Sequence, residues 1–208
     1  MQVFLKLPEE GRVKTRLAED IGEEAAVAAY RVLVARTLAN LPPEFPLSVA
    51  YAPSGAEEAM RAWLSPHLRE RGKDVVWVEQ VDVPCLGDRL RVATGQLFAM
   101  GAGKILAVGA DCPSLAATTY REAERRLHGG DEIVFGPAAD GGYYLVGLAS
   151  PQPVIFNPTI AWSSRRTLET SLQAARGAGL KISLLDERED VDDRSSWERA
   201  RNSLNLVI

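Results

Sequence analysis

The chain has 208 residues, of which 46% are hydrophobic and 25% are charged, a composition typical of a globular protein with a full buried core. Its net charge of −4 argues against bulk binding to nucleic acid, which usually needs a basic face. No apolar run approaches the roughly 18 residues of a membrane span, and no charged leader precedes the first apolar segment. The two cysteines, Cys85 and Cys112, provide no framework of disulfides. We therefore expect a cytoplasmic protein that does not bind membranes.

Strand-like and helix-like segments alternate from one end of the chain to the other. Short apolar runs predict strands at residues 3–7, 47–52, 74–78, 104–108, 132–135, 143–148 and 181–185. Helical spacing of apolar residues predicts helices at 23–41, 56–71, 86–100, 116–128, 163–178 and 195–204. Strands separated by helices indicate parallel pairing, whereas the short connection before residue 143 indicates one antiparallel strand. We predict a single domain over residues 1–208, a three-layer α/β/α fold with a mostly parallel mixed sheet.

The turn after the first predicted strand carries a glycine and three cations. Gly11, Arg12, Lys14 and Arg16 lie there, just before a long helical segment. Glycine lets a ligand approach the backbone closely, and the cations offset phosphate charge that a pocket would desolvate at high cost. The turn therefore suits a di- or triphosphate, although a solvated basic turn is the alternative.

Two acidic segments follow later strands. Asp111 leaves the apolar strand 104–108, where its carboxylate either points into the crevice at the carboxyl ends of the strands or caps the next helix. Residues 186–193 form an acidic loop in which Asp190 and Asp192 alternate, so one of the two should face the sheet. One or two carboxylates together with substrate phosphates typically hold Mg²⁺. Asp111 and Asp192 are the predicted ligands of Mg²⁺ or Mn²⁺, with Asp190 as the alternative to Asp192.

A glycine-rich turn lies between the strands predicted at 132–135 and 143–148. Asp140 and Gly141 are a strong hairpin signal, and with Gly142 they also allow a ligand to lie against the backbone. Asp140 is a candidate to bind a sugar hydroxyl or to assist the metal. We therefore predict a substrate-binding role for this turn in addition to its hairpin geometry.

Two helix starts offer further candidate residues. Trp162 precedes the helix predicted at 163–178 and is either a core residue or a wall for the substrate. Gly87 and Asp88 open the helix predicted at 86–100, where backbone N–H groups can read a base or a phosphate.

Several motifs occur in a defined order along the chain: Lys6-x-Pro8, Gly11-Arg12-Val13-Lys14-Thr15-Arg16-Leu17, Leu86-Gly87-Asp88-Arg89, Gly109-Ala110-Asp111-Cys112-Pro113, Gly136-Pro137-Ala138-Ala139-Asp140-Gly141-Gly142-Tyr143-Tyr144-Leu145 and Trp162-Ser163. Together they resemble a bacterial glycosyltransferase-like family related to the phospholactate guanylyltransferases. That family belongs to the nucleotide-diphospho-sugar transferase superfamily, which has the GT-A fold. The resemblance runs from the first strand to Asp192.

The resemblance implies roles for particular residues. Lys14 and Arg16 would meet the nucleotide phosphates, and Asp111 would bind the metal. Asp192 takes the place of the last aspartate before Thr-Pro-Glu-Asp-Leu in the superfamily, but this chain has Asp-Arg-Ser-Ser-Trp after it. Lys14, Asp111 and Asp140 are the residues expected to be catalytic.

Two enzymatic functions and one binding function fit this pattern. The first is a Mg²⁺-dependent transferase that moves a glycosyl group from a nucleotide-sugar to a small acceptor. The second is a nucleotidyltransferase that joins a nucleoside triphosphate to a phosphorylated small molecule and releases pyrophosphate. The third is a non-catalytic nucleotide-binding domain. All three predict a nucleotide as partner, and a homo-oligomer is compatible with each.

Overall fold

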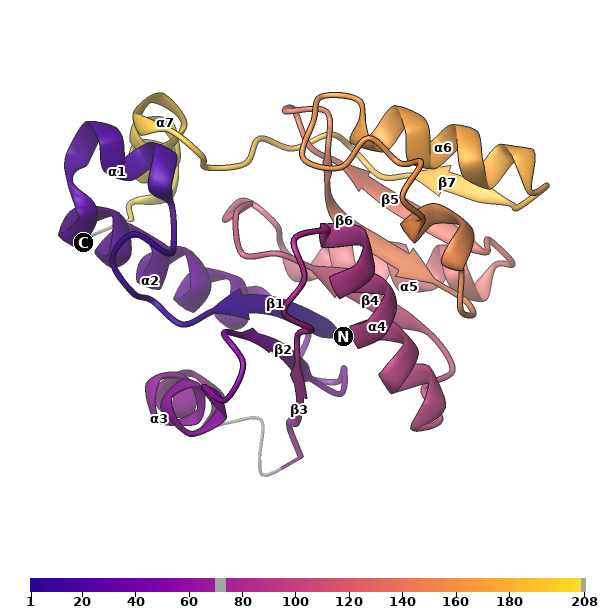
Figure 1. Ribbon diagram of the computed structural model, residues 1–208, viewed down its shortest axis with the longest axis horizontal. Helices are drawn as coiled ribbons and strands as arrows, with labels where there is room; N and C mark the ends of the chain where they lie inside the picture. The colour runs from indigo at the N-terminus through magenta and orange to yellow at the C-terminus, as the bar shows by residue number, and fades with distance from the viewer. Residues whose placement is uncertain (70–73, 207–208) are drawn as a thin grey trace.

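The computed structural model describes residues 1–69 and 74–206 and is built on one seven-stranded sheet (Figure 1). In spatial order the strands are β3 (Val76–Glu79), β2 (Ser48–Ala52), β1 (Gln2–Lys6), β4 (Ile105–Val108), β6 (Tyr143–Leu148), β5 (Ile133–Pro137) and β7 (Ile182–Leu184). Neighbouring strands are parallel except at β6, which runs antiparallel to both β4 and β5. The predicted mostly parallel mixed sheet with one antiparallel strand is confirmed.

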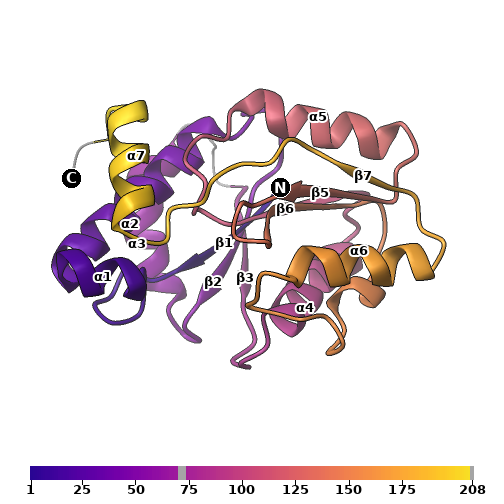
Figure 2. The same ribbon diagram turned by 90° about the horizontal axis from the view of Figure 1, so that it is seen from above.

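Helices cover both faces of the sheet (Figure 2). One layer contains α2 (Glu23–Asn40), α3 (Glu57–Leu68) and α5 (Ala117–His128), and the other contains α4 (Leu86–Ala99), the 3₁₀ helix η2 (Pro153–Phe156) and α6 (Thr167–Gly177). Alternate side chains of β4 pack against the two helix layers: Leu106 and Val108 pack toward α5, whereas Ala107 packs on the α6 side. Because both faces are buried, this strand is apolar throughout, as the sequence shows. The predicted three-layer arrangement is confirmed.

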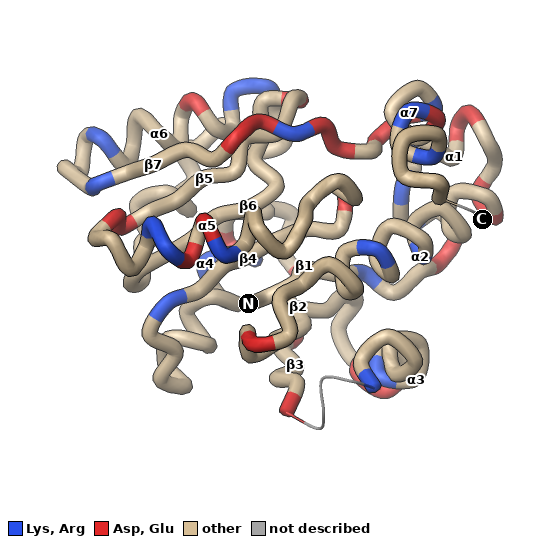
Figure 3. Tube along the Cα trace, turned by 180° about the vertical axis from the view of Figure 1, so that it is seen from behind, with Lys and Arg blue, Asp and Glu red and all other residues tan. Residues whose placement is uncertain are grey.

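A third apolar cluster joins the two ends of the chain. The helix α1 (Thr15–Ile21) packs with α2 and with the last helix, α7 (Arg194–Leu204), through Leu17, Leu33 and Trp197. This packing brings the turn at residues 8–14 beside the acidic segment that leads into α7. Figure 3 shows that segment running from β7 to α7 with several charged residues along it.

Some predicted boundaries differ from the structure. The helix predicted at 163–178 begins only at Thr167, because residues 161–166 form a turn in which Thr167 Oγ1 donates to the backbone oxygens of Ala161 and Ser164, both at 2.8 Å. The short helix α1 was not predicted. The predicted end of the second helix, Arg71, lies outside the described residues. Both cysteines are free. Among the described residues, no helix combines the length and the apolar character needed to cross a membrane.

Candidate nucleotide and metal site

A cavity of about 670 Å³ lies at the carboxyl ends of β1 and β4. Its walls come from three loops that the sequence singled out: the cationic turn with Arg12, Lys14 and Arg16, the loop after β4 with Asp111, and the β5–β6 turn with Asp140. The beginning of α4 closes another side. Ligands of open α/β sheets bind outside the carboxyl ends of strands, so this cavity lies where the fold favours binding.

Lys14 lies at the centre of the charged side of this cavity. It is the N-cap of α1 in the left-handed conformation, with φ of 47°, and its side chain is only 5% exposed. Its ammonium group contacts the Asp111 carboxylate and the backbone oxygen of Val191, and it lies 3.5 Å from Asp192 Oδ1. Burial disfavours the charged form, but Asp111 and Asp192 outweigh it and raise the pKa of Lys14. Lys14 therefore remains a cation that joins two carboxylates from different parts of the chain.

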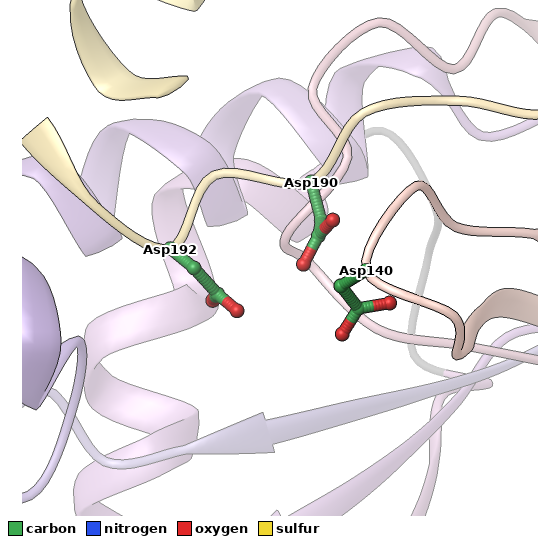
Figure 4. Close-up of side chains that lie close together, drawn as sticks. All are labelled: Asp140, Asp190 and Asp192. Atoms are coloured by element: carbon green, nitrogen blue, oxygen red, sulfur yellow. The ribbon is translucent and has the colours of Figure 1, made fainter. Parts of the chain in front are cut away.

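Three carboxylates gather next to that lysine. Asp140, Asp190 and Asp192 each offer an oxygen, and these oxygens all lie within 4.8 Å of one another (Figure 4). Burial and the nearby charges of Asp140 and Asp192 raise the pKa of Asp190 to about 7. Arg16 Nη1 lies 3.7 Å from Asp192 Oδ2, at the edge of this group. Crowded carboxylates of this kind are stabilised in the ionised form when a cation joins them.

Local structure explains how these side chains reach one place. Val191 is 2% exposed in the cluster that joins α7 to α1, and its backbone N–H donates to Asp111 O at 2.8 Å. The aspartates on either side of Val191 belong to the acidic group, as Figure 4 shows. Asp140 is held by the hairpin, since its Oδ1 accepts from Gly142 N at 2.7 Å.

The donor set fits a hard divalent cation. Carboxylate oxygens are the ligands that Mg²⁺ and Mn²⁺ prefer, and substrate phosphates usually complete the shell. Among the described residues the acidic group contains Asp192 and Asp190, the two alternatives that the sequence left open, together with Asp140. Asp111 is not one of the three carboxylates of that group, and its own carboxylate contacts Lys14.

Two of the predicted binding residues at the start of α4 have packing or pairing partners. A Cβ atom on Gly87 would lie 2.4 Å from the Trp162 ring, so glycine is what allows the indole to pack on α4. Trp162 also stacks on Phe156 with ring centroids 6.5 Å apart, and its Nε1 donates to a backbone oxygen. Asp88 pairs with Arg91 at 3.0 Å. None of Gly87, Asp88 and Trp162 lines the cavity.

The remaining glycines shape the turns around the site. Gly11 has φ of +69° and Gly141 has φ of +90°, conformations that favour glycine. A Cβ atom on Gly141 would lie 2.1 Å from the Arg165 backbone oxygen, so this glycine lets the residue 161–166 turn lie against the hairpin. Gly142 donates to Asp140, as described above. Gly11, Gly141 and Gly142 do not themselves line the cavity. The hairpin expected at Asp140 and Gly141 is present.

Residues 35–164 match a protein family described as "Uncharacterized protein conserved in bacteria (DUF2064)". The chain belongs to this family. No curated protein matches the chain significantly.

Solved structures share the fold of this DUF2064 protein. A candidate nucleotide-diphospho-sugar transferase from Desulfovibrio desulfuricans G20 is 28% identical, with a TM-score of 0.81 over 98% of this chain and 94% of that chain. A CMP:2-keto-3-deoxy-manno-octonic acid synthetase complexed with CTP is 13% identical, with a TM-score of 0.52 over 98% of this chain and 97% of that one. The molybdopterin-guanine dinucleotide biosynthesis protein A of Archaeoglobus fulgidus is 13% identical, with a TM-score of 0.55 over 99% of both chains. The name of the structure at 28% identity and the shared fold confirm the resemblance to the nucleotide-diphospho-sugar transferase superfamily.

Other residues of this DUF2064 chain line the cavity but were not chosen as site residues from the sequence. Ser163 does so with φ of 55°, one of three described non-glycine residues with positive φ. Lys6 and Arg89 add two cations, and Gln80 adds a buried amide. Trp162-Ser163 and Leu86-Gly87-Asp88-Arg89 were visible as motifs, but only the tertiary structure tells which residue of each motif faces the ligand space.

Proposed function

We propose that this protein is a transferase that acts on a nucleotide with a divalent cation, Mg²⁺ or Mn²⁺. The observation that supports it best is the meeting of Asp140, Asp190 and Asp192 beside Lys14 and Arg16, at a cavity that all of these residues except Asp190 line. A cavity that presents grouped carboxylates next to cations suits a polyphosphate and its counter-ion.

The residues divide into two tasks. Asp140, Asp190 and Asp192 would hold the ion, which supplies charge stabilisation at the phosphates and at the leaving group when bound. Arg16 borders that acidic group and is exposed enough to turn toward a phosphate. Lys14 positions Asp111 and Asp192, and it is close enough to the acidic group to contribute positive charge to the reacting phosphate.

The charge on the cavity walls favours nucleotidyl transfer over glycosyl transfer. Five cations line the cavity (Lys6, Arg12, Lys14, Arg16 and Arg89), against the three carboxylates of Asp111, Asp140 and Asp192. Of those cations, only Lys14 and Arg16 form ion pairs with carboxylates among the described residues. A nucleoside triphosphate carries more negative charge than a nucleotide-sugar, whose terminal phosphate is esterified. The excess of cations over carboxylates on the cavity walls therefore stabilises a bound triphosphate more strongly.

In the proposed reaction, a phosphate oxygen of a small acceptor attacks the α-phosphorus of the triphosphate. The bond between that phosphorus and the oxygen bridging to the β-phosphate breaks, and pyrophosphate leaves with the bonding electrons. Glycosyl transfer from a nucleotide-sugar was the first hypothesis from the sequence. It is now the second candidate. The name of the solved structure at 28% identity supports it.

Matched aspartate variants test the metal site. Asp192 belongs to the acidic group, whereas Asp186 lies on the same segment, is exposed and pairs with Arg188 at 3.4 Å. We expect Asp192→Asn to weaken Mn²⁺ binding about tenfold or more in calorimetry, and Asp186→Asn to leave it unchanged. Equal effects of both substitutions would contradict the assignment of the site.

A substrate panel tests the reaction itself. The protein is incubated with Mg²⁺, each of the four nucleoside triphosphates and a set of phosphorylated acceptors, and pyrophosphate is measured. Acceptor-dependent pyrophosphate release supports nucleotidyl transfer. Release of a nucleoside diphosphate from nucleotide-sugars, with no pyrophosphate from triphosphates, would replace that proposal by the glycosyl one.

A further inference from the structure

We propose that Gln80 selects the ligand by accepting a hydrogen bond from it. Gln80 follows β3 directly, is only 6% exposed, and lines both the main cavity and a hollow of about 140 Å³ that adjoins it. This inference rests on the proposed function in one respect: the ligand is taken to be a nucleotide.

The amide of Gln80 is fixed in one orientation. Its Nε2 donates to Ala50 O at 2.8 Å and to Leu5 O at 3.2 Å, which uses both of its hydrogens. The reversed orientation would place Oε1 against two carbonyl oxygens and is therefore excluded by repulsion. The backbone of Gln80 is held as well, since its N–H donates to Tyr51 O at 2.9 Å. The side chain can present only an acceptor to the cavity.

The acceptor oxygen has no partner within the protein. No donor among the described residues binds Gln80 Oε1. Unlike the unpaired polar atoms that the protein encloses completely, this oxygen remains accessible. Gln2 provides the contrast, because its Nε2 also donates to a backbone oxygen, Ala93 O at 3.2 Å, while its Oε1 is fully enclosed. Gln2 does not line either hollow. Of these two amide oxygens, that of Gln80 is therefore the one available to a ligand.

The hollow beside this oxygen combines apolar and charged side chains. Leu7, Pro53 and Val81 line it together with charged residues, three of which are the cations Lys6, Arg12 and Arg89. The neighbouring turn is fixed by Glu79, whose carboxylate accepts from Gly55 N at 2.9 Å and from the Ser54 hydroxyl. An acceptor fixed in the wall of such a hollow favours a ligand group that carries an N–H or O–H donor. A ligand with only acceptors at this point would leave Oε1 desolvated and unpaired, which is costly.

A nucleotide offers such a donor from its base or from its ribose. The wild-type protein is tested for binding of ATP, GTP, CTP, UTP and ITP and of the 2′-deoxy and 3′-deoxy forms of the first four. GTP against ITP reports the 2-amino donor of guanine, and CTP against UTP reports whether the donor is N4–H of cytosine or N3–H of uracil. Each ribonucleotide against its deoxy forms reports a donor on the sugar. We expect about tenfold or greater preference for one member of at least one pair, namely the member whose donor lies opposite Gln80 Oε1.

The decisive measurement is how this preference changes in Gln80→Met. We expect the ratio of dissociation constants within the discriminated pair to fall to about one, because methionine fills the same space without an acceptor. Gln80→Lys is the second variant: it keeps donors for Leu5 O and Ala50 O and also lacks the acceptor. Its added charge affects both members of a pair, so the ratio still reports the hydrogen bond.

Gln2→Met is the matched control, because it removes a buried amide of the same type away from the cavity. It should lower thermal stability and leave the nucleotide ratio unchanged. The inference fails if wild type binds nucleotides but prefers no member of any pair. It also fails if Gln80→Met and Gln80→Lys keep the wild-type ratio, or if Gln2→Met abolishes that ratio too. Absence of any nucleotide binding by wild type would overturn the proposed function as well.

Discussion

Replacement of Lys14 by methionine should separate the structural and binding roles of this lysine. The substitution keeps most of the side-chain volume and removes the ammonium that contacts Asp111, Asp192 and Val191 O. Loss of one partner from a fully buried ion pair costs about 3–5 kcal/mol. Here the carboxylates are 50% and 39% exposed, so water can solvate them, and we expect a loss of about 1–3 kcal/mol in the free energy of unfolding.

The same substitution should change two affinities in opposite directions. Removal of a cation 3.5 Å from Asp192 relieves repulsion against a bound divalent ion. A gain of roughly 1 kcal/mol corresponds to about fivefold tighter Mn²⁺ binding. A triphosphate, by contrast, loses a charged hydrogen bond and should bind about 1–3 kcal/mol more weakly.

Denaturant unfolding without metal measures the stability, and calorimetry measures Mn²⁺ and triphosphate binding separately. Arg12→Met is the control, because Arg12 lines the cavity without an ion pair to a described carboxylate. It should weaken triphosphate binding and leave the stability and Mn²⁺ affinity near wild type. The reasoning is refuted if Lys14→Met leaves stability unchanged, or if it weakens Mn²⁺ binding as well.

Two further predictions concern pH and backbone geometry. Because the pKa of Asp190 is raised to about 7 in the folded protein, ionisation disfavours folding as pH rises from about 4 to 7. Asp190→Asn should therefore stabilise the metal-free protein at pH 8 by roughly 1–2 kcal/mol, a figure reduced for its partial exposure, and have little effect at pH 4. Melting temperatures in EDTA check this, and equal shifts at both pH values would contradict it. Gly141→Ala should destabilise the protein by about 2–4 kcal/mol, because its Cβ would overlap the Arg165 backbone oxygen at positive φ, whereas Gly142→Ala meets only a side chain and should cost less. Equal unfolding free energies of the two variants would refute this.

The order of strands and helices could be predicted because it depends on local patterns. Val134 and its neighbours in β5 are apolar, and the Asp-Gly turn at residues 140–141 places an antiparallel strand directly after them. The same patterns located the cationic turn, Asp111 and Asp140 at carboxyl ends of strands. Loops at one end of a parallel sheet must lie near one another, so their meeting in one cavity follows from the topology.

Contacts between distant residues could not be predicted in this way. Lys14 and Asp192 are far apart in the sequence, and their approach depends on how α1 and α7 pack together. The positive φ at Lys14 and Ser163 leaves no sign in the residue type, since neither is glycine. Gly87 was interpreted as a ligand-binding glycine because the motif does not show that Trp162 packs on it.

The sequence by itself determined the alternating α/β architecture and the loops that border the cavity, because hydrophobic periodicity and turn residues act over a few positions. The tertiary structure alone decided which side chains share a contact. Asp140 joins Asp190 and Asp192, Asp111 joins Lys14, and the oxygen of Gln80 remains open to a ligand. The physical reason is that the direction of a side chain is set by the packing of elements remote in the chain, on which local sequence has no influence.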